Sequence, residues 1–220
     1  MDLVIFDCDG VLIDSEMLSA AVLTEMAAEV GFAITPEIFR SDFLGRSFAT
    51  ASARAEKRWG RGFPADFNMN YRARLLARMK GNLPAMPGVR AVLDAMRAPF
   101  CLATSSSPPR LAVSMAETGL GPYFEGRMYT ASMVANGKPA PDLMLHAAAA
   151  MNATPESCLV IEDSEMGLRA GLAAGMQVWH FIGGAHMQGM AAPPEDVRPH
   201  RTLDSMPALH DAFRELGLAT

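Results

Sequence analysis

Short apolar runs alternate with helical patterns over much of this chain, and that alternation restricts the fold more than any other feature. The strand-like runs are Leu3–Phe6, Phe100–Ala103, Cys158–Ile161 and Gln177–Phe181. The helical patterns that separate the last three runs are Pro108–Thr118, Pro141–Met151 and Ser164–Ala174. Strands that alternate with helices indicate a parallel sheet covered by helices on both faces. We therefore expect a doubly wound α/β fold with a Rossmann-like core.

The segment from Asp14 to about Pro84 breaks this alternation and reads as a string of helices. The expected helices are Glu16–Val30, Pro36–Phe43, Ser47–Trp59 and Asp66–Lys80. Thr35 before Pro36 is typical of a helix N-cap followed by proline in the first turn. The stretch LPAMPG, Leu83–Gly88, is typical of a linker that returns to the sheet. We predict a catalytic core at 1–13 and 86–220, with a helical cap inserted at 14–85.

Four carboxylates follow two of the strand-like runs. Asp7 and Asp9 come after the first run, and Glu162 and Asp163 come after the run at Cys158–Ile161. Ligand sites of doubly wound sheets lie at the carboxyl ends of the strands, so these acids should meet. Four carboxylates cannot all stay ionised at one place without a cation. Oxygen ligands without a Cys or His cluster favour a hard divalent ion, and Mg²⁺ is the one expected here.

Hydroxyl groups and a lysine lie at neighbouring positions. Thr104 and Ser105 follow the run at Phe100–Ala103, and Lys138 lies in GKPAPD ahead of a helix. These groups would form an anion cradle beside the metal, because Mg²⁺ commonly shares its ligands with a substrate phosphate. One carboxylate could then attack phosphorus while another shuttles a proton. The alternative is that the hydroxyls only cap the helix at Pro108 and that Lys138 is a surface lysine.

Four motifs resemble those of the haloacid dehalogenase-like hydrolase superfamily. They are FDCDGVLIDSE, LATSSS, GKPAPD and VIEDSEMGLRAGLAAGM, and they occur in that family's order. The resemblance covers essentially the whole chain, since the helical segment lies where one branch carries its cap. That branch is β-phosphoglucomutase-like and includes sugar-phosphate phosphatases of the 6-phosphogluconate phosphatase type. The resemblance implies a Mg²⁺-dependent phosphatase that acts on a sugar or sugar-acid phosphate through an aspartyl-phosphate.

The resemblance also implies individual roles. Asp7 would be the nucleophile and Asp9 the general acid/base. Thr104, Lys138 and the backbone amide of Ser105 would hold the phosphoryl group. Dehalogenase chemistry is disfavoured, because that branch typically lacks the second aspartate of the first motif and Asp9 is present here.

The metal ligands implied by the resemblance come from the same two acidic pairs. Mg²⁺ would be bound by Asp7, the backbone carbonyl of Asp9 and Asp163. Glu162 would bind it directly or through water. The competing interpretation of Glu162 and Asp163 is that they cap the helix that begins near Ser164.

The cap is where the resemblance to mutases weakens. FLGRS, Phe43–Ser47, matches the cap loop that closes over substrate, so Arg46 and Ser47 are candidate substrate contacts, although Arg46 could equally be a solvated charge. Mutases carry a histidine and an arginine where this chain has Ser19 and Phe48. We therefore favour a phosphatase, with a phosphomutase and a non-catalytic phospho-ligand binding protein as alternatives.

Two other reactive side chains lie close to the motifs. Cys8 stands between the two aspartates, but a strand alternates its faces, so its thiol should point away from them into the core. His186, in FIGGAH, is the one histidine near a predicted site edge. The five histidines show no metal-type spacing, and we expect His186 to lie outside the site.

Composition excludes several classes of partner. The net charge is −5 and no basic run is present, which argues against nucleic acid. No apolar run is long enough to span a bilayer. Three cysteines in apolar segments, and an acid among the first residues, favour a reduced, cytoplasmic protein without a secretory signal. We expect a monomer whose partner is a small phosphorylated metabolite.

Overall fold

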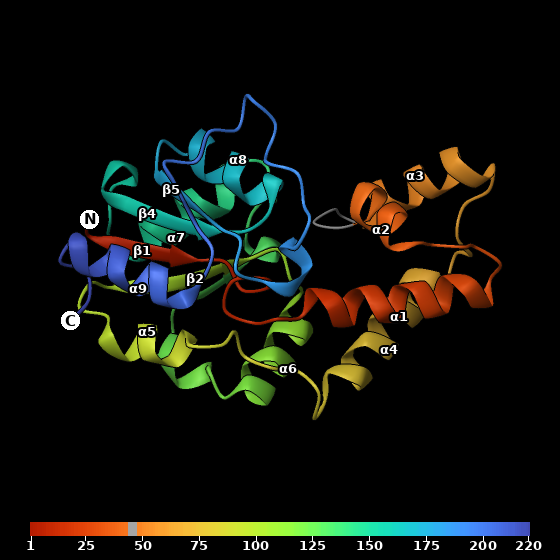
Figure 1. The fold of residues 1–220 in the computed structure, drawn as a ribbon, viewed down its shortest axis with the longest axis horizontal. Coiled ribbons are helices and arrows are strands. Elements are labelled where there is room, and N and C mark those ends of the chain that lie inside the picture. Colours follow the sequence, from red (N-terminus) through yellow and green to blue (C-terminus); the bar gives the residue numbers. More distant parts are fainter. Residues whose placement is uncertain (44–47) are drawn as a thin grey trace.

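The structure, a computed structural model, describes residues 1–43 and 48–220, apart from the side chains of Arg40 and Ala49. Its centre is a parallel sheet with the strand order β3-β2-β1-β4-β5-β6 (Figure 1). The strands are β1 (Leu3–Phe6), β2 (Phe100–Thr104), β3 (Met128–Thr130), β4 (Cys158–Glu162), β5 (Gln177–Phe181) and β6 (Arg201–Leu203). The doubly wound α/β prediction is confirmed. The edge strands β3 and β6 were not predicted, because three-residue runs carry little periodic signal.

The sheet is buried on both faces, and side chains of β1 alternate between two hydrophobic clusters. Val4 and Phe6 belong to one cluster, while Leu3 and Ile5 belong to the other. The first face is covered by α5 (Val89–Ala95), α6 (Pro108–Thr118) and α9 (Met206–Glu215). The second is covered by α7 (Asp142–Ala150) and α8 (Glu165–Ala173). Helices on both faces explain why the central strands are continuously apolar.

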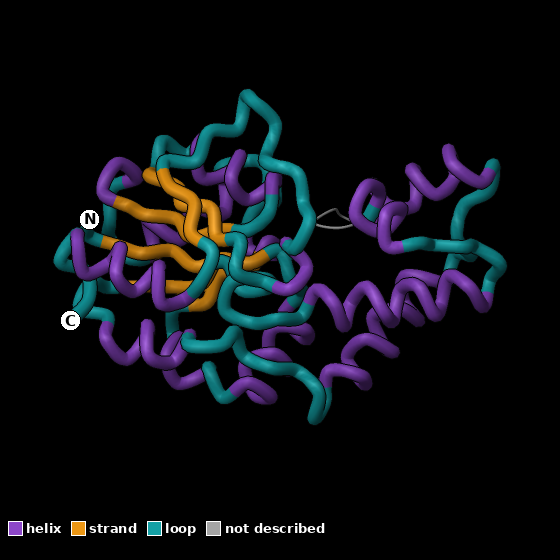
Figure 2. Tube along the Cα trace, viewed as in Figure 1, coloured by secondary structure: helices purple, strands orange, loops and turns teal. Residues whose placement is uncertain are grey.

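The segment between β1 and α5 is helical and lies to one side of the sheet. Its helices are α1 (Glu16–Glu29), α2 (Pro36–Asp42), α3 (Phe48–Trp59) and α4 (Phe67–Met79). Figure 2 shows only helices and loops among the described residues of this segment. The Thr35 hydroxyl accepts a hydrogen bond from the Ile38 amide at 3.3 Å, so the expected N-cap is present. The cap boundaries at 14 and 85 remain our proposal.

Two chain segments connect this helical segment to the sheet, and they run side by side. Ile13 forms an antiparallel bridge with Ala85. The Asp14 amide donates to the Pro84 carbonyl at 3.2 Å, and the Met86 amide donates to the Leu12 carbonyl at 2.9 Å. The linker predicted at Leu83–Gly88 is therefore paired with the segment that leaves β1, directly beneath α1.

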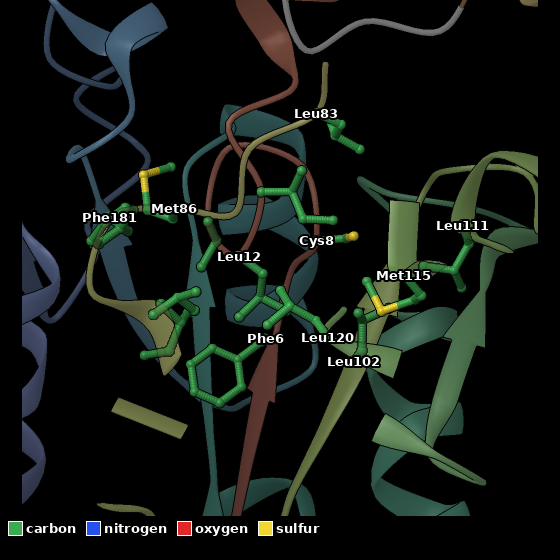
Figure 3. Packing of buried hydrophobic residues seen from close by; sticks show 14 of the residues in the cluster. Phe6, Cys8, Leu12, Leu83, Met86, Leu102, Leu111, Met115, Leu120 and Phe181 are labelled. Atoms are coloured by element: carbon green, nitrogen blue, oxygen red, sulfur yellow. The ribbon is translucent and has the colours of Figure 1, made fainter. Parts of the chain in front are cut away.

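Apolar side chains pack tightly around β1, whose last residue precedes Asp7. Figure 3 shows Phe6, Cys8 and Leu12 among other apolar side chains of the cluster on the first face of the sheet. The Phe6 ring makes edge-to-face contacts with Phe100 and Phe213, at centroid distances of 6.1 and 6.0 Å. Such a packed core fixes the positions of the residues that follow β1. Among the described residues, no helix is long and apolar enough to cross a membrane.

Candidate active site

The ends of three neighbouring strands bring the predicted residues together at one edge of the sheet. Phe6 pairs with Leu102 of β2 and with Ile161 of β4. The next residue of β1, Asp7, therefore stands between the ends of β2 and β4, and its amide donates to the Ile161 carbonyl at 2.9 Å. Parallel pairing in register is what turns three separate sequence motifs into one site.

Lys138 neutralises the centre of this site. Its ammonium donates to Asp7 Oδ1 and to Glu162 Oε1, both at 2.6 Å, and to the Ala103 carbonyl at 3.0 Å. The Lys138 side chain is only 3% exposed, so the interpretation as a surface lysine is wrong. Burial alone would lower the pKa of Lys138, but the charges of Asp7 and Glu162 outweigh it, and the net shift is upward. The ammonium therefore stays charged.

Three buried carboxylates form a group suited to a cation. Asp7, Glu162 and Asp163 each offer an oxygen, and these oxygens lie within 4.8 Å of one another. Burial raises the pKa of Asp7 well above its ordinary value, although Lys138 opposes the shift. Burial likewise raises the pKa of Asp163 to about 7. One lysine is thus too little positive charge for three buried acids, and an oxygen-only donor set fits a hard divalent ion.

The backbone beside these acids leaves no room for extra side chains. Gly10 has φ +84°, a conformation that favours glycine, and a Cβ there would overlap the Asp163 carboxylate and the His186 ring. A Cβ at Gly167, in the first turn of α8, would overlap the Glu162 carboxylate. Glu162 also accepts hydrogen bonds from the Ser164 amide at 2.8 Å and the Ser164 hydroxyl at 2.9 Å. The cap of α8 is Ser164 itself, whose hydroxyl accepts from the Gly167 amide at 3.1 Å.

Asp9 lies apart from the three-carboxylate group and has its own set of donors. The hydroxyls of Ser15 and Ser106 each donate to its carboxylate at 2.5 Å, and Arg110 Nη2 donates at 2.7 Å. Burial alone would raise the pKa of Asp9, but Arg110 and the two hydroxyls outweigh it and lower the pKa. In the metal-free protein, the two aspartates of the first motif therefore have pKa values shifted in opposite directions.

The phosphate-binding residues predicted after β2 lie at the rim of this site. Thr104 is buried, and its hydroxyl accepts a hydrogen bond from the Ser106 amide at 3.0 Å. Ser105 is exposed. Ser107 is the N-cap residue of α6 but makes no side-chain capping hydrogen bond. The Thr104 hydroxyl therefore orders the loop after β2, the Ser106 hydroxyl holds Asp9, and side-chain capping of α6 does not account for them.

Cap residues reach the site through α1. Ser19, at the position where mutases carry a histidine, is buried and accepts a hydrogen bond from Arg110 Nη2 at 3.3 Å. Phe48, at the position of the mutase arginine, packs on Phe67 at a centroid distance of 6.1 Å. The candidate substrate contacts Arg46 and Ser47 lie outside the described residues.

Two residues of the site were missed or misjudged. Arg110 was not singled out, although it follows the LATSSS motif by a few residues on α6. His186 was expected outside the site, yet its Nε2 lies 2.8 Å from Asp163 Oδ2 and its side chain is 4% exposed. His186 reaches Asp163 because the loop after β5 lies against the residues that follow β4. In the sequence, the only indication of this contact is that FIGGAH follows a strand-like run. Cys8, in contrast, is fully buried in the apolar cluster, as expected.

Comparisons with known proteins agree with this geometry. A model of the haloacid dehalogenase-like hydrolase family matches residues 1–175. The 6-phosphogluconate phosphatase of Escherichia coli strain K12 is 30% identical over 213 residues, 96% of each chain. A haloacid dehalogenase-like protein of Agrobacterium tumefaciens is 30% identical, with a TM-score of 0.86 over 99% of each chain. A haloacid dehalogenase family hydrolase of Deinococcus radiodurans, solved with bound phosphate and sodium, is 33% identical, with a TM-score of 0.82 over 100% of this chain and 98% of that one. The chain therefore belongs to the haloacid dehalogenase-like hydrolase family and is one of its phosphatase hydrolases.

Proposed function

We propose that this protein is a Mg²⁺-dependent phosphatase that hydrolyses a small phosphorylated sugar or sugar acid through an aspartyl-phosphate. The observation that carries the proposal is the position of Asp7. Its carboxylate accepts a hydrogen bond from Lys138 and belongs to a group of buried carboxylates suited to a cation. The E. coli relative is a phosphatase of a sugar-acid phosphate, and the D. radiodurans relative binds phosphate, which supports the proposed substrate class.

Asp7 and Asp9 divide the reaction between them. An oxygen of Asp7 attacks phosphorus, the bond to the ester oxygen breaks, and Asp9 gives its proton to the departing alcohol. Water then attacks the phosphorus of the aspartyl-phosphate, Asp9 takes the proton from that water, and the bond to Asp7 breaks to release phosphate. Serine and arginine donors fix the orientation of the Asp9 carboxylate for both proton transfers.

The remaining residues compensate charge. Asp7, Asp163 and Glu162, with the backbone carbonyl of Asp9, would hold the Mg²⁺. When bound, this ion withdraws charge from the phosphoryl oxygens and lessens their repulsion of the attacking carboxylate. Lys138, which is hydrogen-bonded to Asp7 Oδ1, acts in the same direction, and Thr104 with the Ser105 amide would bind the phosphoryl oxygens.

The two alternatives have less support. A mutase must grip a second phosphate, and Ser19 and Phe48 bring no positive charge to the positions that mutases use for this. A protein that only binds a phosphorylated ligand has no need of the Asp7 and Asp9 pair. Arg46 and Ser47 remain proposed substrate contacts. That the protein acts as a monomer in the cytoplasm also remains a prediction.

Phosphate release from a panel of phosphorylated sugars, sugar acids and small alcohols tests the proposal. We expect release with Mg²⁺, loss of release with EDTA, and no release by Asp7→Asn, which is isosteric but not nucleophilic. Exposed Asp211→Asn is the matched control. A turnover that appears only when a sugar bisphosphate is added would instead indicate a mutase. No turnover under any condition would favour the binding protein.

A further inference from the structure

One carboxylate above the catalytic acids has no part in the proposed reaction. Glu16 is the first residue of α1, and its side chain is 19% exposed. Asp9, Asp14 and His186 are close enough to act on its charge, and Asp163 in turn feels the charge of Glu16. Among the described residues its carboxylate accepts no hydrogen bond, and its nearest charged partner, Arg110 Nη2, stands 3.9 Å away. A largely buried carboxylate without donors is costly unless a further partner is supplied.

Within the described residues, Arg110 has an unpaired hydrogen-bond donor, whereas Glu16 has an unpaired acceptor. It lies in the first turn of α6, and its guanidinium reaches from the core to the cap, where Nη2 contacts Asp9 at 2.7 Å and the hydroxyls of Ser15 and Ser19 at 3.3 Å. Its Nε is buried and donates to nothing in the described part of the chain. An arginine fork has five N–H donors, so the guanidinium has donors left for an oxygen atom of a bound molecule.

The position of Arg110 and Glu16 relative to Asp9 indicates which part of the substrate these two residues would contact. In the proposed reaction the ester oxygen of the substrate lies within about 3 Å of the Asp9 carboxylate. Arg110 is hydrogen-bonded to that same carboxylate, so the atoms next to the ester oxygen come within reach of the guanidinium. Oxygens on adjacent carbons of a sugar are separated by about one hydrogen-bond length. A hydroxyl beside the phosphorylated carbon can therefore accept from Arg110 and donate to Glu16.

We propose that Arg110 and Glu16 recognise a hydroxyl group on the carbon adjacent to the phosphorylated carbon, so that the enzyme selects polyol phosphates over simple alkyl phosphates. This inference rests on the proposed phosphatase function and specifies its leaving group. A donor and an acceptor held together suit a hydroxyl, which is both, whereas a second anion would face Asp9 and Glu16 and be repelled.

The test compares two substrates that differ by one atom. They are sorbitol 6-phosphate and its 5-deoxy analogue, which lacks only the hydroxyl adjacent to the phosphorylated carbon. We expect wild-type kcat/KM to favour the parent by at least about tenfold, because the analogue leaves both charged groups without their partner. Arg110→Met and Glu16→Met should reduce this ratio toward one. Glu16→Gln, which keeps an acceptor, should retain part of it.

The controls separate this inference from the function on which it rests. Arg97→Met and Glu56→Gln alter exposed residues elsewhere and should leave the ratio unchanged. A wild-type ratio near one, or a high ratio that survives in both Met variants, overturns the inference while phosphatase activity stands. Absence of turnover by the wild type on the whole panel overturns the proposed function itself. Should Arg110→Met fail to fold by circular dichroism, Glu16→Met decides alone, since methionine is a good helix former and Glu16 makes no hydrogen bond among the described residues.

Discussion

The ammonium of Lys138 lies 2.6 Å from Asp7 Oδ1, and both side chains are at least nine-tenths buried. The same ammonium neutralises Glu162, so Lys138→Met would leave buried carboxylates without compensation. Losing one partner of a buried ion pair typically costs about 3–5 kcal/mol. We therefore expect a loss of about that size in the free energy of unfolding. We also expect kcat at saturating Mg²⁺ to fall by about a hundredfold to a thousandfold, as when a group that stabilises the charge of a transition state is removed. Lys57→Met, on the exposed side of α3, is the matched control. A fall of less than about tenfold would show that the lysine is not needed for charge compensation.

Gly167 offers a steric test of the carboxylate group. A Cβ at this position would overlap the Glu162 carboxylate, so Gly167→Ala must displace Glu162 from Lys138. We expect a loss of about 1–3 kcal/mol in the free energy of unfolding, as for other overpacked sites. The Mg²⁺ concentration for half-maximal activity should rise as well. A Cβ at Gly62 would meet open space, so Gly62→Ala should change neither measurement. Unchanged Mg²⁺ dependence in Gly167→Ala would remove Glu162 from the metal site.

Much of this architecture could be predicted because its signals are local. The runs at β1, β2 and β4 are apolar on both faces, and each ends at or just before a polar residue, which locates strands and site together. Helix α5, the edge strands and α9 were not predicted. Helix α9 has a start signal that was not used, the N-cap Ser205 with Pro207 in the first turn. The edge strands have three residues each and α5 has seven, which is too few for a clear periodic signal. Whether such short segments form helices or strands depends on tertiary packing.

The site shows the same division. Asp7, Asp9, Lys138 and the acids after β4 are each marked by a motif, and strand register brings them together. Arg110 and His186 reach their carboxylates across 101 and 23 residues of sequence. Nothing within α6 or the loop after β5 indicates those contacts, because they depend on where the helix and the loop lie over the strand ends. Sequence reasoning found the candidate reacting groups and missed Arg110 and misjudged His186, which contact two of them.

The stability of the metal-free protein should depend on pH in an unusual direction. Burial raises the pKa of Asp163 from 3.8 to about 7, and that of Asp7 shifts the same way. Between these two values the folded protein holds a proton that the unfolded chain does not. Each step upward in pH therefore lowers the free energy of unfolding, until the folded-state pKa is passed. We expect the melting temperature in EDTA to fall between about pH 5 and about pH 7.5.

Magnesium should cancel that loss, because the ion binds the carboxylates in their ionised form. The rise in melting temperature on adding Mg²⁺ is then small at about pH 5 and large at about pH 7.5. Thermal unfolding followed by circular dichroism measures both curves. Asp163→Asn should flatten the dependence in EDTA and remove most of the Mg²⁺ effect. A Mg²⁺ effect that does not change with pH would contradict the proposed ligand set.

Cys8 provides a test of chemistry that the site should not perform. The thiol lies between Asp7 and Asp9 in the chain, but it is fully buried in the apolar cluster (Figure 3). Burial raises the pKa of Cys8 well above its ordinary value, and the charges of Asp9 and Asp7 add to the shift. Thiolate is the reactive form, so the thiol should be inert. We expect iodoacetamide to leave native activity intact and to label Cys8 only after unfolding. Cys8→Ala should keep its turnover and lose about 1 kcal/mol of stability, as a small buried truncation does. Rapid inactivation with Cys8 as the labelled residue, or loss of turnover in a folded Cys8→Ala, would place the thiol in the reaction.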